Sequence, residues 1–433
     1  MRKLHRSLIL MALLVASLQL PATASATDKF FVHNGDRVVF LGDSITEQRL
    51  YTTYLEAYTL SRYPKWQLTF RNVGWGGDTS WLRQRSHTDE GKLFAANPEE
   101  QQKMVEQAVA AGLERDVLPL SPTAITIKFG MNDHSYQAFR EDIFRAYVRS
   151  QSQLANVLEA NGARVAFLTP QPIEDKRPDP DKEVKNISLR KFSDGLKQVA
   201  VEKHALFVDQ FDPYMALMMT ARAENPNAII GGGDAVHPGP PGHTIMAWAI
   251  LKGLGASALV STAEVKVRNG KAKVGSVKQC KIAKLKAEGD GISFDRLDGS
   301  LPMPIDSRAL PALKLAPILN DLSCYELKVA GLTAAKYDVT IDGEKAGTVT
   351  KEELAAGWNM TTADGPIATQ NAELLKLVFE KNNVFFDRWR NVQLNPNRQS
   401  ELPALDQKIA DLETRIHEVR QPKPHHFELK PAM

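Results

Sequence analysis

A serine that could act as a nucleophile follows an apolar run near the start of the chain, in the stretch VVFLGDSITEQ (residues 38–48). A second stretch, GGGDAVHPGPPGH (residues 231–243), carries Asp234 three residues before His237. Acyl transfer through a covalent intermediate needs a nucleophile, a base that takes its proton, and a carboxylate that orients the base. Ser44, His237 and Asp234 are therefore the candidate catalytic residues, in that order of roles.

Two further stretches offer hydrogen-bond donors for a developing oxyanion. NVGWGGDTS (residues 72–80) contains Gly77, and KFGMNDHSY (residues 128–136) contains Asn132. A glycine lets a backbone N–H approach a ligand closely, and a side-chain amide donates in the same way. With the backbone N–H of Ser44, these groups are the candidate oxyanion hole. The neighbouring residues that we expect to line the substrate are Asp43, Trp75 and His134.

The candidate residues follow short apolar runs that predict strands. The predicted strands are residues 38–41, 68–70, 124–127, 165–168 and 206–208, and amphipathic stretches lie between them, most clearly over residues 136–161. Strands that alternate with helices predict a parallel sheet covered on both faces. Ligands of such sheets bind beyond the carboxyl ends of the strands. The sequence therefore predicts that the four stretches meet at one edge of the sheet.

Taken together, the four stretches resemble the SGNH (GDSL-type) hydrolase family. The matching blocks are Gly42-Asp43-Ser44, Gly77, Gly130-Met131-Asn132-Asp133 and Asp234-Ala235-Val236-His237. The resemblance extends over about residues 36 to 255. It implies a flavodoxin-like α/β/α sandwich with a parallel sheet. It also implies Ser44 as nucleophile, His237 as base, Asp234 as its orienting carboxylate, Ser44, Gly77 and Asn132 as oxyanion donors, and neither a metal nor another cofactor.

A metal-dependent phosphoesterase is an alternative interpretation of the same stretches. The side chains that could bind two metal ions are Asp43, Asp78, Asp133, His134, Asp234 and His237. None of these stretches has a paired His-x-His or Asp-x-His spacing, and a two-metal site leaves Ser44 and Asn132 without a role. The sequence favours the serine hydrolase.

The substrate class and the identity of the base each admit a second interpretation. A lysophospholipase or thioesterase would use the same catalytic residues, and a glycan-binding module would have lost them. His243 could replace His237 as the base, although no acidic residue lies three positions before it. The nucleophile motif G-x-S-x-G is absent from the chain, and the S-x-x-K match at residues 188–191 lacks its companion motifs.

The N-terminus indicates export. Basic residues precede an apolar run over residues 8–18, and Ala24-Ser25-Ala26 provides a cleavage site. We expect a signal peptide over residues 1–26, a secreted or periplasmic protein, and no membrane span after signal removal. With 54 basic and 51 acidic residues, the chain of 433 residues has a net charge of +3, and we expect no nucleic-acid partner.

The second half of the chain differs from the first. We expect a hydrolase domain over residues 27–262, a β-rich accessory region over 263–353, and a helical C-terminal segment over 354–433. That segment has an apolar stripe, predicted to pack on the rest of the chain or, alternatively, to form a dimer: Leu405, Ile409, Leu412, Ile416 and Val419. In an oxidising compartment Cys280 and Cys324 are expected to pair, with two free thiols as the alternative.

These observations predict an exported serine ester hydrolase that acts through an acyl-enzyme. A small-molecule or carbohydrate ester is the expected substrate. Export, the near-neutral charge and the lack of a long apolar lid segment near the candidate site favour a carbohydrate O-acetylesterase or a similar short-chain carboxylesterase over a lipase. The sequence leaves the oligomeric state open.

Overall fold

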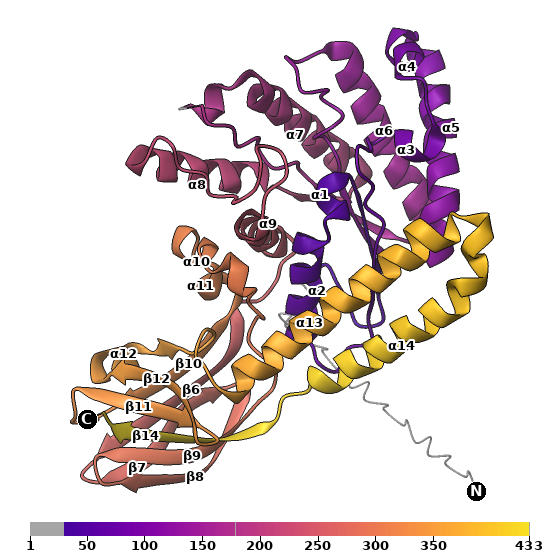
Figure 1. The fold of residues 1–433 in the computed structure, drawn as a ribbon. Coiled ribbons are helices and arrows are strands. Elements are labelled where there is room, and N and C mark those ends of the chain that lie inside the picture. Colours follow the sequence, from indigo (N-terminus) through magenta and orange to yellow (C-terminus); the bar gives the residue numbers. More distant parts are fainter. Residues whose placement is uncertain (1–29, 178, 433) are drawn as a thin grey trace, which may run out of the picture.

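The first half of the chain folds around a parallel sheet. The computed structural model describes residues 30–177 and 179–432 (Figure 1), so the expected signal peptide over residues 1–26 lies outside the described residues. The sheet has five strands in the order β2-β1-β3-β4-β5, and all neighbours are parallel. The strands are β1 (Arg37–Gly42), β2 (Thr69–Asn72), β3 (Ala124–Lys128), β4 (Arg164–Leu168) and β5 (Leu206–Val208).

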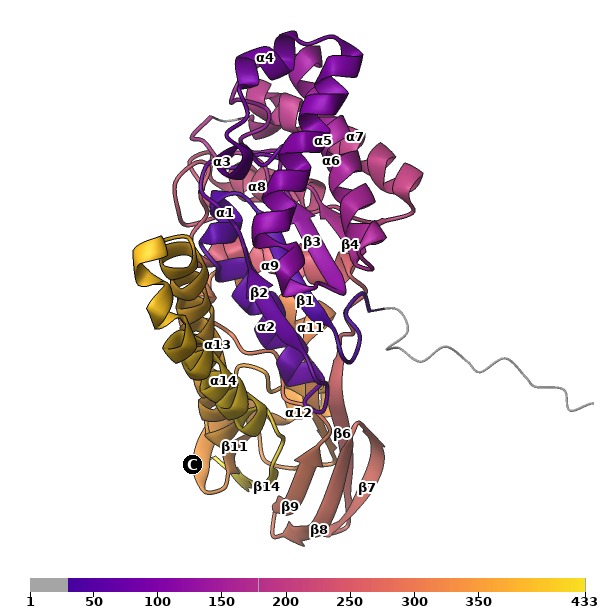
Figure 2. The ribbon, with the colours of Figure 1, turned by 90° about the vertical axis from the view of Figure 1, so that its right-hand side faces the viewer.

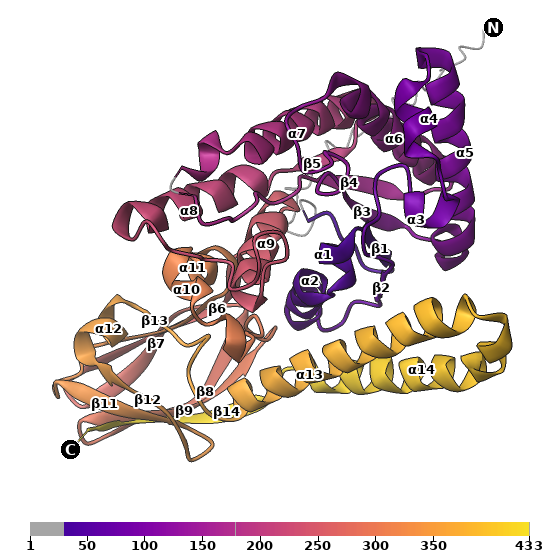
Figure 3. The ribbon, with the colours of Figure 1, turned by 45° about the horizontal axis from the view of Figure 1, so that its top comes forward.

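Helices cover both faces of this sheet. In Figure 3, α5, α6 and α7 lie along one face, and α2 and α9 lie along the other. The helices of this half are α1 (Ser44–Glu47), α2 (Leu50–Arg62), α3 (Arg83–Ser86), α4 (Glu90–Ala95), α5 (Pro98–Asp116), α6 (Glu141–Ala160), α7 (Val184–Lys203), α8 (Phe211–Glu224) and α9 (Pro240–Gly253). The central strands β1 and β3 are buried over nearly their whole length, as a sheet covered on both faces requires. The predicted α/β/α sandwich is confirmed.

One predicted helix begins later than expected. The amphipathic pattern over residues 136–161 predicts a helix from Tyr136, but α6 begins at Glu141. Ser135 and Tyr136 have left-handed φ angles of 54° and 55°, which a right-handed helix does not contain. The apolar side chains before Glu141 therefore belong to a turn.

A β-sandwich with a core of its own follows the parallel sheet. One mixed sheet has the order β13-β10-β6-β7, and a second, antiparallel sheet has the order β12-β11-β14-β9-β8. The strands are β6 (Leu259–Arg268), β7 (Lys271–Lys278), β8 (Cys280–Glu288), β9 (Gly291–Asp298), β10 (Cys324–Ala330), β11 (Lys336–Ile341), β12 (Glu344–Thr350) and β13 (Trp358–Asn359). Short helices interrupt them: α10 (Ala312–Leu315), α11 (Ile318–Leu322) and α12 (Lys351–Ala356). The strands β11 and β12 form a hairpin that turns at Asp342-Gly343, with both turn residues at positive φ.

A helical hairpin runs from the sandwich back along the parallel sheet (Figure 2). It consists of α13 (Pro366–Phe386), a π-helical turn (Asp387–Gln393) and α14 (Leu402–Val419). In the apolar stripe of α14, Ile409, Leu412 and Ile416 are buried, and α14 packs along α13. From α13, the ammonium of Lys381 lies 2.7 Å from the Glu56 carboxylate on α2, and both side chains are buried.

Two expectations for the second half are wrong. The C-terminal segment is not helical to its end, because β14 (Pro424–Pro431) inserts between β9 and β11. Its buried residues His425, Phe427 and Leu429 alternate with more exposed ones, which is the period of a strand. Cys280 and Cys324 are not paired: both are free thiols, and they lie on strands of different sheets.

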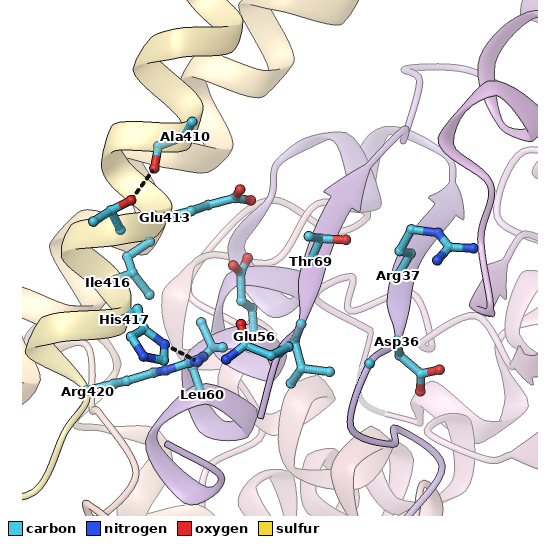
Figure 4. A pocket seen from close by; sticks show the side chains of 14 residues that line it. Asp36, Arg37, Glu56, Leu60, Thr69, Ala410, Glu413, Ile416, His417 and Arg420 are labelled. Carbon is cyan, nitrogen blue, oxygen red and sulfur yellow. Dashed lines mark hydrogen bonds between the residues drawn. The ribbon is translucent and has the colours of Figure 1, made fainter. Parts of the chain in front are cut away.

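A cleft of about 540 Å³ lies between α14 and the β2 edge of the parallel sheet (Figure 4). Figure 4 shows Glu413, His417 and Arg420 on the α14 side and Glu56 and Thr69 opposite them. None of the candidate catalytic residues lines it. Over residues 30–177 and 179–432, no helix combines the length and the apolar character that a membrane crossing requires.

Candidate active site

Ser44 lies directly beyond the carboxyl end of β1. The Asp43 side chain accepts a hydrogen bond from the backbone N–H of Ile45 (3.0 Å) and so caps α1, of which Ser44 is the first residue. The N–H groups of a first helical turn have no acceptor within the helix. The cap therefore leaves both the Ser44 hydroxyl and the Ser44 backbone N–H available at the sheet edge.

The His237 imidazole joins Ser44 to Asp234. The Ser44 Oγ lies 2.9 Å from His237 Nε2, and His237 Nδ1 lies 3.2 Å from Asp234 Oδ2. A carboxylate only accepts hydrogen bonds, so Nδ1 carries the proton in this arrangement and Nε2 accepts from the serine hydroxyl. That is the orientation in which an imidazole can remove the hydroxyl proton.

Asp234 is held as a carboxylate by its own loop. Its Oδ1 accepts from the backbone N–H groups of Val236 and His237, each at 2.7 Å. Although partial burial acts to raise it, the pKa of Asp234 lies below its ordinary value because these N–H groups and the His237 side chain donate to the charged form. Asp234 therefore keeps its charge to a lower pH than an ordinary aspartate, and the charged carboxylate accepts the hydrogen bond from His237 Nδ1.

The loop after β4 fixes the segment that carries His237. The buried Glu174 carboxylate accepts from the N–H groups of Ile230 (2.6 Å) and Gly231 (2.8 Å). Gln171 donates from its side-chain amide to the carbonyl of Val236 (2.9 Å). Burial raises the pKa of Glu174, against the stabilising effect of these N–H donors. Both residues lie after the carboxyl end of β4, and sequence reasoning missed them because no sequence pattern indicates their partners.

The Asn132 side-chain amide is held by two hydrogen bonds. Its Nδ2 donates to the carbonyl of Asp78 (2.9 Å), and its Oδ1 accepts from the hydroxyl of Tyr136 (3.1 Å). These two contacts distinguish the oxygen of the amide from the nitrogen and leave the second N–H hydrogen for another acceptor. Sequence reasoning missed Tyr136, although it lies four residues after Asn132.

The glycine loop that contains Gly77 lies against α1. A Cβ at Gly74 would stand 2.4 Å from the Glu47 backbone nitrogen, and one at Gly76 would stand 2.7 Å from the Glu47 carboxylate. Gly77 has a φ of +73°, and its carbonyl, which belongs to the peptide group that follows it, accepts from Arg83 Nε (2.6 Å). The close approach explains the run of glycines.

Asp43, His134 and Trp75 were expected to line the substrate. Asp43 and His134 are 0% and 2% exposed, so neither has surface to offer. Asp43 lies 4.0 Å from the buried ammonium of Lys128, and burial lowers the pKa of His134 to about 4. Trp75 is half-buried and packs on Arg390 and Trp389 of the C-terminal hairpin. Burial thus speaks against a substrate contact for Asp43 and His134, whereas the substrate-lining role of Trp75 stays a prediction.

His243 does not take the place of His237. It is fully buried, its Nδ1 accepts from the backbone N–H of Tyr51 (3.2 Å), and its Nε2 lies 2.7 Å from Gln48 Oε1. Burial lowers its pKa to about 3. Both ring nitrogens have hydrogen-bond partners within the fold, so neither is available to Ser44.

The carboxylates of the two-metal alternative are used elsewhere. Asp78 forms a buried ion pair with Arg85. Asp133 accepts from the N–H groups of Ser80 and Gly130, each at 2.9 Å, and burial raises its pKa to about 6. Within the described ranges, no three or more His, Cys, Asp or Glu side chains are grouped as a metal site. The donors thus connect loops to one another instead of converging on one point.

Comparisons with known proteins agree with this fold. Residues 40–245 match the model of the GDSL-like Lipase/Acylhydrolase family. An acetylxylan esterase of Geobacillus stearothermophilus is 24% identical over 245 residues, which are 52% of this chain and 96% of that protein.

Two solved structures are also similar. A gut microbial diltiazem-metabolizing enzyme has a TM-score of 0.75 at 22% identity, over 92% of this chain and 98% of its own. A crystal structure of the Geobacillus stearothermophilus acetylxylan esterase has a TM-score of 0.39 at 20% identity, over 51% of this chain and 95% of its own. The first likeness extends the shared fold to the sandwich and the hairpin.

Proposed function

Residues 40–245 belong to the GDSL-like lipase/acylhydrolase family, and from this membership we propose that the chain is an exported serine esterase that removes short acyl groups from carbohydrates. The observation that carries the proposal is the Ser44 Oγ to His237 Nε2 distance of 2.9 Å, with Asp234 on the other ring nitrogen. Export rests on the N-terminal sequence pattern alone.

The proposed reaction has two halves. In the first, Ser44 Oγ attacks the ester carbonyl carbon while His237 Nε2 takes the hydroxyl proton, and His237 then gives that proton to the departing sugar alkoxide. In the second, His237 takes a proton from water as the water oxygen attacks the acyl-enzyme, and returns it to Ser44 as the carboxylic acid leaves. Asp234 stabilises the imidazolium that forms in each half.

The oxyanion that forms in both halves needs donors at the sheet edge. The Ser44 and Gly77 backbone N–H groups and the free amide hydrogen of Asn132 are proposed for this role. The contacts of Asn132 with Asp78 and Tyr136 support it, because they fix the amide before substrate arrives. Donors that need no reorganisation are the most effective kind.

Exposure of the base favours a bulky alcohol and a short acyl group. The side chains of His237 and Asp234 are 36% and 67% exposed, so a large leaving group can reach them without a tunnel. The likeness of half the chain to an acetylxylan esterase supports acetate as the acyl group and a carbohydrate as the alcohol. A thioesterase or lysophospholipase would have to bind a long acyl chain at this open site.

The test compares ester hydrolysis by wild-type, Ser44→Ala and Ser400→Ala proteins. Ser400 is exposed in the turn before α14 and serves as the matched control. We expect turnover of p-nitrophenyl acetate and of acetylated xylo-oligosaccharide by wild-type and control, a decline toward palmitate, and almost none by Ser44→Ala. Equal rates for Ser44→Ala and wild-type contradict the proposal, and a preference for palmitate contradicts the substrate class.

A further inference from the structure

A strongly basic surface lies on the β-sandwich, away from the candidate active site. Residues 266–288 contain eight lysines and arginines and one acidic residue, in a chain whose totals are nearly balanced at 54 and 51. We define the basic face by the six lysines on β7 and β8: Lys271, Lys273, Lys278, Lys281, Lys284 and Lys286. All six lysines are exposed.

The pleat of the two strands turns these lysines outward. Ala272 on β7 and Ile282 and Leu285 on β8 pack against the sandwich core, and lysines occupy positions beside them. A register shift between Ala283 and Lys286, with Lys284 at a φ of 50°, adds one residue to β8. Such a bulge re-aims side chains locally, and here it leaves Lys284 exposed as well as Lys281 and Lys286.

The lysines of the basic face come from neighbouring edge strands of two sheets. β7 is an edge strand of one sheet and β8 is an edge strand of the other, and the two strands contact each other. Figures 1 and 2 both show them side by side at the end of the molecule opposite α1. Lys271 and Lys273, two positions apart on β7, are separated by about 7 Å, so their charges lie close together.

Most of these charges have no acidic partner. Lys284 lies 2.8 Å from Asp295. For the other five lysines, no carboxylate among the described residues lies within 4.0 Å. An ammonium group attracts a polyanion most strongly where no carboxylate of its own protein neutralises it.

Protection of the sheet edges accounts for only part of this pattern. Lysines on edge strands prevent the strands from pairing with another molecule. Charges of mixed sign on a surface serve solubility equally well, yet among the described residues only Lys284 of the six lysines has a carboxylate within 4.0 Å. The excess of one sign favours an anionic partner.

The side chains on the face restrict the kind of polyanion. Residues 266–288 contain no Phe, Trp or Tyr, so the face has no platform on which nucleic-acid bases could stack and no aromatic anchor for a membrane interface. Lysine ammonium groups act as separate point charges, which suits a polymer with one carboxylate per sugar.

We propose that the basic face binds an acidic, carboxylate-bearing polysaccharide and holds the enzyme on it while the distant site removes acyl groups. The choice of a polysaccharide among polyanions rests on the proposed function, whereas the presence of an anion-binding face does not. Because the face lies far from Ser44, its loss is expected to affect retention on polymer and to leave the hydrolysis of small esters unchanged.

The test measures binding of the full chain to polygalacturonate at low salt, with neutral xylan for comparison. The face variant carries Lys271→Gln, Lys273→Gln, Lys281→Gln and Lys286→Gln. Its matched control carries Lys65→Gln, Lys92→Gln, Lys103→Gln and Lys197→Gln, four exposed lysines of the parallel-sheet domain. Both variants change the net charge by the same amount.

We expect wild-type and control to bind polygalacturonate with similar affinity, which falls as salt rises, and the face variant to bind at least about tenfold more weakly. Equal weakening in both variants, or no binding by wild-type, overturns the proposal. Binding to anionic phospholipid vesicles without binding to polygalacturonate also overturns it. A face variant that aggregates, but whose monomer binds polygalacturonate as the wild type does, overturns it too. Turnover of p-nitrophenyl acetate is measured separately, so that a chain that binds but does not hydrolyse refutes the proposed function alone.

Discussion

The guanidinium carbon of Arg390 lies 3.4 Å from the centre of the Trp75 ring. Arg390 belongs to the π-helical turn of the C-terminal hairpin, and Trp75 belongs to the glycine loop that carries Gly77. Arg390 Nε also lies 4.0 Å from the carboxylate of Glu47, the last residue of α1. The hairpin thus supports both the serine helix and the glycine loop from outside.

We expect Arg390→Ala to lower kcat for p-nitrophenyl acetate about three- to tenfold with little change in KM. The glycine loop loses a cation over its tryptophan, an interaction of about 1–2 kcal/mol where it is partly buried, and the Gly77 N–H then samples more positions. Steady-state kinetics measure the effect. Arg388→Ala is the control, since Arg388 in the same turn contacts Asp406 on α14. An equal loss in both variants would assign the effect to the hairpin as a whole.

Asn132→Ala should reduce kcat on the order of 10²-fold, the usual cost of one oxyanion donor. Tyr136→Phe should reduce it less, because the amide remains but loses the hydroxyl that orients it. Steady-state rates with one small ester give both numbers, and Asn156→Ala on the exposed face of α6 is the control. A Tyr136→Phe protein slower than Asn132→Ala would contradict this order.

Glu174→Gln is expected to lower kcat and to reduce the free energy of unfolding by about 1–3 kcal/mol. One of the two N–H groups that now donate to the carboxylate would face the amide NH₂ of glutamine instead. The His237 loop would then shift. Urea unfolding and steady-state kinetics check both effects, with Glu224→Gln as an exposed control. Wild-type kcat in Glu174→Gln would show that the carboxylate does not position the loop.

Lys381→Met should destabilise the protein by about 3–5 kcal/mol, because it leaves the buried Glu56 carboxylate without its cation. The double variant Lys381→Met/Glu56→Leu should recover a large part of this loss, since neither charge then remains buried. Unfolding in urea measures all three proteins. The exposed Lys376→Met on α13 should change stability by less than about 0.5 kcal/mol. A double variant no more stable than Lys381→Met would contradict the pairing.

His243→Gln should make stability less dependent on pH between 7 and 5. The folded-state pKa of His243 is lowered to about 3 by burial, so the unfolded state takes up the proton first as pH falls below about 6.5. Protonation of His243 in the unfolded state therefore lowers the free energy of unfolding of the wild type by about 2 kcal/mol at pH 5. The variant lacks this loss. Urea unfolding at the two pH values tests it, with exposed His33→Gln as the control. Equal pH dependence in both variants would exclude His243 as the cause.

Local patterns predicted the parallel sheet well. The five apolar runs coincide with β1 to β5 within one or two residues, because a strand buried on both faces must be apolar throughout. Other elements depended on distant contacts. The spacing around Tyr136 predicted a helix, but this residue lies in a turn, where its hydroxyl donates to Asn132. The C-terminal residues were predicted to be helical, but they form β14, which pairs with β9 and β11.

The candidate site, too, could be predicted only in part from local sequence. Ser44 follows the end of β1, and the topology of a parallel sheet makes that position a candidate site, whereas Asp234 and His237 lie in the loop between α8 and α9 and were found from their own spacing. Glu174 and Arg390 stabilise those loops through partners 56 and more than 300 residues away in the chain, for which the sequence has no periodic signal. Sequence could therefore single out side chains that the structure brings together, but not the residues that hold their loops.

The position of β14 has a consequence for the order in which the chain can fold during synthesis. The parallel sheet is complete once residue 208 has been made, whereas the second sandwich sheet lacks its central strand until residue 431 emerges. Until then β9 and β11 are open edges, which are prone to pairing with other chains. A chain terminated between α14 and β14 would thus carry a complete parallel sheet joined to an incomplete, aggregation-prone sandwich.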